Sequence, residues 1–193
     1  MEHIKQELDK TRTYWTQPVR NFIHNLVSII ISQKIPFRQS RLIRQQMYQK
    51  YQTNLFTYDL LIKITAHEWQ ELGLGQAKIA TINQVLKLGQ CPNVNDLKKI
   101  KGIGSWTIKS LKIMSNLLEP NEDFFLEEDY WVRKILSKIL DRKKVMTQRE
   151  AKKYVDANWK DSKVELTKFL WRLKPEGAEI LNKKGALSNI NFL

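Results

Sequence analysis

The sequence predicts an all-α protein of about ten short helices. Three observations support this prediction. Apolar residues recur every three or four positions along most of the chain, which is the spacing of one face of an α-helix. Glycine, proline and capping residues separate these segments, and no segment alternates convincingly with the period of two that a half-buried β-strand requires.

The first half of the chain predicts six helices. An apolar helix starts at Val19 and is interrupted before Pro36, because proline cannot continue a helix. Helices over about 38–51, 57–64, 66–72 and 76–88 follow, and Gly89 ends the last of these. We expect Asn95 to cap a short helix from Asp96 to Ile100.

The second half predicts four longer helices. After the turn Gly102-Ile103-Gly104, we expect Ser105 to cap a helix that runs to about residue 118. The next helix covers 128–140. Thr147 and Glu150 have the spacing of a capping box, which opens a helix to about residue 159. The last helix starts at Asp161 or Ser162 and ends near residue 173, and the tail from residue 175 is expected to be irregular.

The composition indicates a polyanionic partner. The 193 residues include 33 Lys and Arg but only 20 Asp and Glu, a net charge of +13. Nucleic acid is the commonest such partner, and an anionic membrane surface is the alternative. The single cysteine, Cys91, excludes an intramolecular disulfide and a cysteine-ligated iron–sulfur cluster. The charged N-terminus MEHIKQELDK lacks a signal-peptide core, so we expect a soluble intracellular protein without a membrane segment.

A Gly-Ile-Gly turn joins a short helix to a long one at 97–118. Glycine allows a positive φ and a close backbone approach, and the first amide groups of the second helix can then bind a phosphate. Four lysines lie near this turn in the sequence: Lys98, Lys99, Lys101 and Lys109. On the turn alone, an ordinary connection between two helices in a basic protein is an equally good interpretation.

Four segments together resemble the helix-hairpin-helix DNA glycosylase superfamily. They are LVSIIISQKIPFRQSRLI, ELGLGQAKIATINQVLKL, LKKIKGIGSWT and FLEEDYWVRKIL, and the resemblance covers roughly residues 19 to 173. It is closest to the 3-methyladenine DNA glycosylase II family. The resemblance implies one glycosylase domain over 1–193, with an active-site cleft between two lobes. The central lobe covers about 35–118, including the hairpin 97–118, and the N-terminal helices with about 128–193 form the other.

The resemblance also implies an activity. Such an enzyme flips a damaged base out of duplex DNA and hydrolyses its N-glycosidic bond, leaving an abasic site. By its place in the motif, Asp129 is the catalytic carboxylate; the alternative is that Asp129 only caps the helix that follows it. We expect the neighbouring acids, Asp123 among them, to be solvated loop residues. The alternatives are a glycosylase for uracil, hypoxanthine or an oxidised purine, or a damage-binding protein without catalysis.

Trp106 separates the branches of the superfamily. It stands where bifunctional members carry a nucleophilic lysine, so we expect no strand cleavage. The resemblance places Trp106, Tyr130 and Trp171 around the base, where aromatic rings can stack on a cationic lesion. For Trp171, a place in the hydrophobic core is an equal alternative. Where the bacterial 3-methyladenine glycosylase of this family has a tyrosine in its base pocket, this chain has Ser110. The resemblance therefore does not determine which lesion is preferred.

The resemblance assigns the DNA contacts as well. The partner is double-stranded DNA with a damaged base, bound by a monomer that needs no organic cofactor. Either Lys34 or Ile35 is expected to fill the gap left by the flipped base. Residues expected to bind the DNA backbone are Gly102, Gly104, Thr107, Lys101 and Lys109. Carbonyl groups expected to hold a bound Na⁺ or K⁺ ion are those of Lys98, Ile100 and Ile103.

Overall fold

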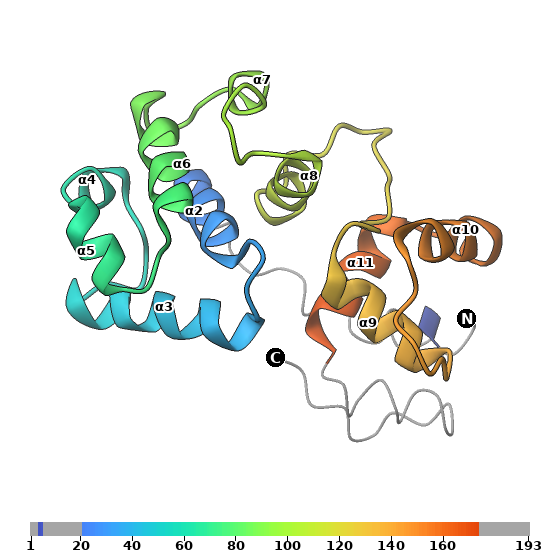
Figure 1. Cartoon of the computed structure of the whole chain (residues 1–193). Coiled ribbons are helices and arrows are strands. Elements are labelled where there is room, and N and C mark those ends of the chain that lie inside the picture. The colour runs from blue at the N-terminus through green and yellow to red at the C-terminus, as the bar shows by residue number, and fades with distance from the viewer. Residues whose placement is uncertain (1–3, 6–20, 174–193) are drawn as a thin grey trace. The chain divides into compact units, whose positions relative to one another are not determined.

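The computed structural model describes residues 4, 5 and 21–173 of the chain. Every regular element in this part of the chain is an α-helix, which confirms the all-α prediction (Figure 1). The described helices are α2 (Phe22–Ser32), α3 (Phe37–Lys50), α4 (Tyr58–Leu61), α5 (Ala66–Glu71), α6 (Gln76–Lys87), α7 (Val94–Leu97), α8 (Ser105–Met114), α9 (Tyr130–Ile139), α10 (Gln148–Asn158) and α11 (Lys163–Arg172). None of these helices has the length and apolar character needed to span a membrane.

The chain divides into two compact units. Residues Val19–Leu117 form one of them, which we call the hairpin unit because it contains α7 and α8. Met1–Pro18 and Leu118–Leu193 form the other, which we call the carboxylate unit because it contains Asp129. We expected the first apolar helix to join the lobe of the C-terminal helices, but α2 belongs to the hairpin unit.

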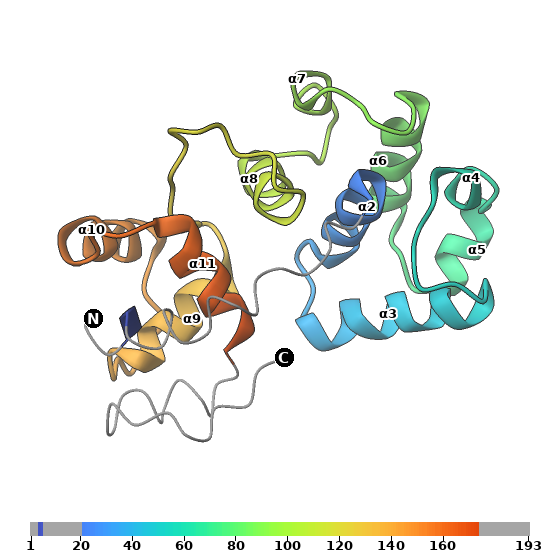
Figure 2. The same cartoon turned by 180° about the vertical axis from the view of Figure 1, so that it is seen from behind.

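The burial of α2 explains where it belongs. Nine of its eleven residues are buried, so it needs neighbours on most of its surface. Helices α3, α6 and α8 supply them, and both views of the chain show α2 among these helices (Figures 1 and 2). A helix that is apolar over most of its circumference is stable only at the centre of a unit.

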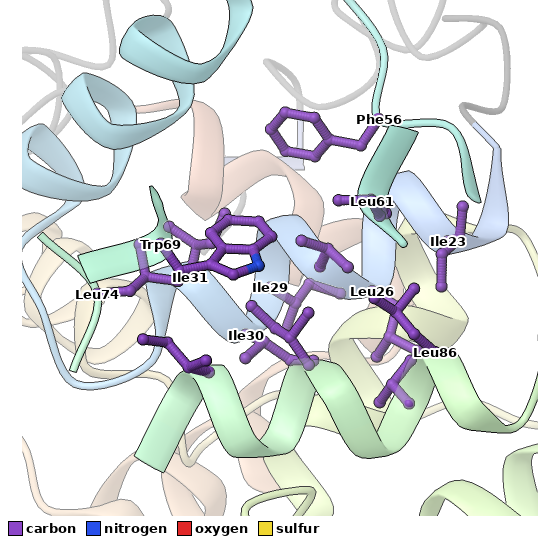
Figure 3. Packing of buried hydrophobic residues seen from close by; sticks show 14 of the residues in the cluster. Ile23, Leu26, Ile29, Ile30, Ile31, Phe56, Leu61, Trp69, Leu74 and Leu86 are labelled. Carbon is purple, nitrogen blue, oxygen red and sulfur yellow. The ribbon is translucent and has the colours of Figure 1, made fainter. Parts of the chain in front are cut away.

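Large apolar side chains fill the core of the hairpin unit (Figure 3). Ile23, Leu26 and Ile30 of α2 are fully buried, as are Phe56 and Trp69 from the segments that cover it. Burying one such side chain stabilises a fold by roughly 1.5–3 kcal/mol. Because α2 and α6 pack in this core, the loop that follows each of these helices starts from a fixed position.

A separate core holds the carboxylate unit together. Val132, Ile135 and Leu136 of α9 pack with Val155 of α10 and Phe169 of α11, and all five are buried. Helix α9 contacts both α10 and α11. The start of α9, where Asp129 lies, is therefore supported by its own hydrophobic cluster.

The residues at the start of each helix show which of the predicted caps are present. Thr147 and Glu150 form the predicted capping box of α10, and Ser162 rather than Asp161 caps α11. Two predicted caps are wrong. Asn93, not Asn95, caps α7, which begins two residues earlier than expected; the Asn93 Oδ1 accepts from the Asn95 N–H at 2.8 Å. Helix α8 starts after Gly104 with no side-chain cap, and Ser105 is its first residue.

Two predicted helix ends also differ from the structure. Helix α8 ends at Met114 rather than near residue 118, because Asn116 adopts a positive φ of 54° that a helix does not allow. The predicted first helix begins at Phe22 in the described residues, with Asn21 as its cap. The expectation for the tail from residue 175 lies outside the described residues.

Candidate functional site

Of the two glycines in the turn between α7 and α8, Gly102 is the one whose position requires glycine. Gly102 has a φ of +98°, which side chains rarely adopt. A Cβ at this position would also lie 2.5 Å from the Thr81 Oγ1 of α6. Gly104 differs, because its φ is −104° and a Cβ there would meet nothing within 4 Å. The space beside the Gly104 Cα is therefore open at the start of α8.

Two side chains from other helices hold the turn in place. The Gln33 Nε2 donates to the Gly102 carbonyl at 2.8 Å and to the Thr107 Oγ1 at 2.9 Å. The Thr81 hydroxyl lies within hydrogen-bond distance of the Lys101 carbonyl, at 3.1 Å. Because Gln33 directly follows α2 and Thr81 lies on α6, the turn is fixed to the core of the hairpin unit.

The start of α8 can bind an anion. The capping residue of α8 is Gly104, which has no side chain that could accept from the first amide groups of this ten-residue helix, among them that of Thr107. These groups and the positive end of the helix dipole favour a negatively charged ligand. Thr107 is buried, and its hydroxyl already accepts from Gln33.

The predicted basic residues near this turn are not equivalent. The side chains of Lys98 and Lys101 are exposed, and Lys109 is half-buried on α8. The Lys99 Nζ instead lies 2.7 Å from the Asp96 carboxylate. Surface ion pairs of this kind contribute little to stability, but they neutralise the charge locally. Lys98 and Lys101 are therefore the more effective cations of the turn.

The predicted cation ligands are three carbonyl groups of the same turn. The Ile100 carbonyl accepts from the Ile103 N–H at 3.0 Å. The carbonyls of Lys98 and Ile103 accept no backbone hydrogen bond from the described residues. Carbonyl oxygens are suitable ligands for a hard monovalent cation, so this donor set fits the predicted site.

The loop from Gln33 to Pro36 contains both residues that were predicted to fill the gap left by the flipped base, and their side chains differ in exposure. Lys34 is exposed and has a φ of 53°, an uncommon conformation for a residue with a side chain. Ile35 is only partly exposed and packs against the core of the hairpin unit. Of the two side chains, that of Lys34 is the one available to a partner.

Two cations that were not predicted hold the C-terminal end of α2, just before this loop. The Lys78 Nζ of α6 donates to the Ile31 carbonyl at 2.6 Å, and the Arg44 Nη1 of α3 donates to the Ser32 Oγ at 3.0 Å. Burial lowers the pKa of the Lys78 ammonium. Positive charge at a helix C-terminus interacts favourably with the helix dipole, so these contacts stabilise the position of the loop.

The first half of α3 is an exposed basic surface that the sequence analysis did not identify. Arg38 and Arg41 are exposed, and neither forms an ion pair with the described residues. At the other end of α3, the Lys50 Nζ lies 3.4 Å from Glu68 and 3.2 Å from Glu71. The positive charge of α3 is therefore concentrated near Lys34. The signal was present in the sequence, because the stretch FRQSRLIRQQ contains three arginines and no acid.

Asp129 is a buried carboxylate with a defined orientation. It is 8% exposed and caps α9, where its Oδ1 accepts from the Val132 N–H at 3.0 Å. Its Oδ2 accepts from the indole Nε1 of Trp171 at 3.3 Å. Asp129 is thus a helix cap, and an aspartate that caps a helix can also serve as a catalytic carboxylate.

The three predicted aromatic residues lie in different units. Tyr130, directly after Asp129, is 60% exposed, and the Arg133 Cζ lies 5.7 Å from its ring centroid. Trp171 is half-buried against the core of the carboxylate unit and also bonds to Asp129. Trp106 belongs to the hairpin unit and packs partly against its core. The structure thus brings Tyr130 and Trp171 to Asp129 within one unit.

The sequence analysis missed the contacts of one acid. Asp123 is an exposed loop residue, as expected, but its carboxylate also accepts from three groups at the start of α11. The donors are the Ser162 hydroxyl, the Lys163 N–H and the Val164 N–H, each at 3.1 Å. Its partners are about 40 residues away in the sequence, so local spacing could not reveal them.

Comparison with solved structures identifies similar folds. A 3-methyladenine DNA glycosylase of Schizosaccharomyces pombe, Mag1, in complex with abasic DNA, has a TM-score of 0.66 and 17% identity over 86% of this chain and 88% of that one. A 3-methyladenine DNA glycosylase of Archaeoglobus fulgidus has a TM-score of 0.64 and 16% identity over 78% of this chain and 57% of that one. A DNA-3-methyladenine glycosidase of Bacillus halodurans has a TM-score of 0.58 and 18% identity over 89% and 82%.

These likenesses establish the fold. The chain has the helical fold of 3-methyladenine DNA glycosylases, as the motifs in the sequence predicted. It spans little more than half of the Archaeoglobus protein. No model of a known protein family matches the chain, and no curated protein sequence matches it either.

Proposed function

We propose that this protein is a monofunctional DNA glycosylase that removes alkylated purines of the 3-methyladenine and 7-methylguanine type from duplex DNA. The observation that carries the proposal is the Asp129 carboxylate, held by two hydrogen bonds at the start of α9, in a chain with the fold of 3-methyladenine glycosylases. The Schizosaccharomyces protein of this fold is in complex with abasic DNA, which supports DNA as the partner. The protein acts as a monomer on DNA inside the cell.

Asp129 stabilises the charge that develops on the sugar. When the N-glycosidic bond breaks, both electrons leave with the base and the deoxyribose becomes positively charged at C1′. Water then adds to C1′ and loses a proton, which leaves an abasic site. A carboxylate that is already oriented by Val132 and Trp171 stabilises this cation without reorganising during the reaction. Tyr130 and Trp106 offer aromatic surfaces on which an electron-poor base can stack.

The hairpin unit holds the DNA backbone. The amides of Gly102, Gly104 and Thr107 bind phosphate at the start of α8, and Lys101 and Lys109 add positive charge. Because this binding rests on phosphate contacts, it has little sequence preference and weakens steeply with salt. Arg38 and Arg41 extend the basic surface along α3.

Lys34 is our choice for the residue that fills the space of the flipped base. Its side chain is exposed, whereas Ile35 already packs against the core. The aliphatic part of a lysine can lie against apolar surface while its ammonium reaches a phosphate. A monovalent cation, Na⁺ or K⁺, would be held by the carbonyls of Lys98, Ile100 and Ile103 and would add positive charge beside a phosphate.

Release of free base from defined substrates tests the proposal. Duplexes with a single 3-methyladenine, 7-methylguanine, hypoxanthine, uracil or oxidised purine are incubated with the protein, and the released base is quantified. We expect release of the alkylated purines and an abasic product. Release of only another base would move the assignment to a different lesion. Binding without any release would indicate a damage-binding protein.

The product chemistry is tested with borohydride. Trp106 stands where bifunctional relatives of the superfamily carry their lysine, so no Schiff base should form. We expect no covalent DNA adduct after reduction. A strong adduct would contradict the monofunctional assignment and would point to another amine of the protein.

A further inference from the structure

The segment from Asp123 to Asp129 is tied to α11 at three regularly spaced points. At the first, Asp123 accepts from the Ser162 hydroxyl and from the amides of Lys163 and Val164, each at 3.1 Å. At the second, the Leu126 N–H donates to the Thr167 Oγ1 at 3.2 Å. At the third, the Asp129 Oδ2 accepts from the Trp171 Nε1 at 3.3 Å.

The spacing of these points matches the geometry of a helix. In the segment they lie three residues apart, at 123, 126 and 129. On α11 they lie four residues apart, at 163, 167 and 171, and residues with this spacing share one face of a helix. The face of α11 therefore acts as a template that sets where each part of the segment lies.

Asp123 forms the most hydrogen bonds of the three attachments. Its exposed carboxylate accepts three, two of them from amides in the first turn of α11. Bonds to a charged acceptor are stronger than neutral ones, and a carboxylate at a helix N-terminus also interacts favourably with the helix dipole. The second point is a single neutral bond, although Phe125 and Leu126 are buried there.

We propose that Asp123 is a positioning residue for the reaction, which it serves by fixing the register of the segment on α11 and thereby the position of the Asp129 carboxylate. The inference rests on the proposed function of Asp129. The carboxylate must lie close to the developing charge on the sugar, and a displacement of about 1 Å can cost on the order of 100-fold in rate. Asp123 reaches no reacting atom, so it affects the reaction only through Asp129.

Two substitutions at Asp123 test the proposal on the full-length protein. Asp123→Ala removes all three acceptor bonds. Asp123→Asn retains one acceptor oxygen for Ser162 and Val164 but places an amide group opposite the Lys163 N–H. We expect the single-turnover excision rate to fall on the order of 10- to 100-fold in the alanine variant and less in the asparagine variant. The dissociation constant for the lesion duplex should stay unchanged, since the hairpin unit is intact.

Thr147→Ala is the matched control. It removes the N-terminal cap of α10 in the same unit, so it lowers the unfolding midpoint by the same mechanism. Helix α10 makes none of the three attachments, and its variant should excise at the wild-type rate. The proposal is overturned if Asp123→Ala excises at the wild-type rate, or if Thr147→Ala slows excision as much. Should Asp123→Ala fail to fold, the same comparison is made with Asp123→Asn.

A spectroscopic readout separates this inference from the proposed function. The indole N–H of Trp171, one of six in the chain, is assigned in an NMR spectrum with the variant Trp171→Phe. We expect its signal to shift in Asp123→Ala and not in Thr147→Ala. An unshifted Trp171 signal in Asp123→Ala overturns the proposal whether or not the protein releases a base. A wild-type protein that releases no base overturns the proposed function instead.

Discussion

The hairpin unit and the carboxylate unit differ most in their charge. The hairpin unit, 19–117, contains 14 Lys and Arg and 4 Asp and Glu, a net charge of +10. The carboxylate unit contains 19 Lys and Arg and 16 Asp and Glu, a net charge of +3. Most of the excess positive charge therefore lies in the unit with the Gly102-Ile103-Gly104 turn, although the other unit has more basic residues.

The acids have different tasks in the two units. In the hairpin unit, Glu68 and Glu71 pair with Lys50, and Asp96 pairs with Lys99, so these ion pairs do not involve Lys34 or Lys101. In the carboxylate unit, acids hold the structure that presents Asp129. Under the proposed function, the hairpin unit binds the DNA backbone by charge and the carboxylate unit supplies Asp129 for the reaction.

Substitution of Asp129 should have the largest effect on the reaction. Asp129→Asn can still cap α9 but loses the negative charge, and we expect a loss of about 3–4 kcal/mol of transition-state stabilisation, or several hundred-fold in rate. DNA binding should be unchanged or stronger, because a neutral side chain does not repel phosphate. Single-turnover excision and equilibrium binding are measured on the same lesion duplex. Excision at the wild-type rate would show that Asp129 is only a cap.

Substitution of Gly102 should damage the hairpin unit alone. Gly102→Ala combines a positive φ with a Cβ placed 2.5 Å from the Thr81 Oγ1, so we expect a destabilisation of about 1–3 kcal/mol and weaker DNA binding. Denaturant unfolding and binding titrations measure both. The double variant Gly102→Ala with Thr81→Ala should recover the part of the lost stability that is due to the contact with Thr81. Full stability of Gly102→Ala would contradict the turn geometry.

Equal losses of charge in the two units should have unequal effects on binding. Replacing Lys98 and Lys101 by alanine should lower the slope of log K against log salt by about 2, because each lysine neutralises a phosphate. Replacing Lys143 and Lys144 of the carboxylate unit, which removes the same charge, should leave the slope nearly unchanged. Equal changes in slope would mean that net charge, rather than its location, determines binding.

The acid stability of the hairpin unit should depend modestly on Glu68. Hydrogen bonds from the backbone and hydroxyl of Thr65, then from Tyr51, lower the pKa of Glu68 from 4.5 to about 2. Its stabilising effect is therefore complete above pH 4.5 and is lost as the pH falls toward 2. Glu68→Gln should flatten the pH dependence of the unfolding midpoint in this range. An unchanged pH profile would show that these bonds do not persist in solution.

Local signals in the sequence predicted most helices and the Asp129 cap. A capping box such as Thr147 with Glu150 needs only residues that are close in the chain, so spacing alone reveals it. Ser105 was predicted to cap α8 from residue type, but the extended residue before the helix is Gly104, which leaves no side chain in the capping position. The grouping of α2 with the hairpin could not be predicted, because an apolar surface does not specify which helices cover it.

The contacts that orient the candidate site join residues far apart in the chain. Gln33 is 69 residues from Gly102, and Asp129 is 42 residues from Trp171. The resemblance in the sequence identified the segment that contains Gln33 and named Asp129 and Trp171, but not these bonds. Geometry was needed to show that Asp123 binds the start of α11 and that Lys34, rather than Ile35, is exposed.

A crossed measurement tests the division of roles between the two units most directly. The dissociation constant and the single-turnover excision rate at saturating protein are determined on one lesion duplex for two variants: Asp129→Asn, and the alanine pair at Lys98 and Lys101. We predict that Asp129→Asn lowers the rate several hundred-fold without weakening binding, and that the lysine pair weakens binding while the saturated rate stays near wild type. If both variants change the same quantity, or if the lysine pair lowers the saturated rate as much as Asp129→Asn does, the division of binding and chemistry between the two units is contradicted.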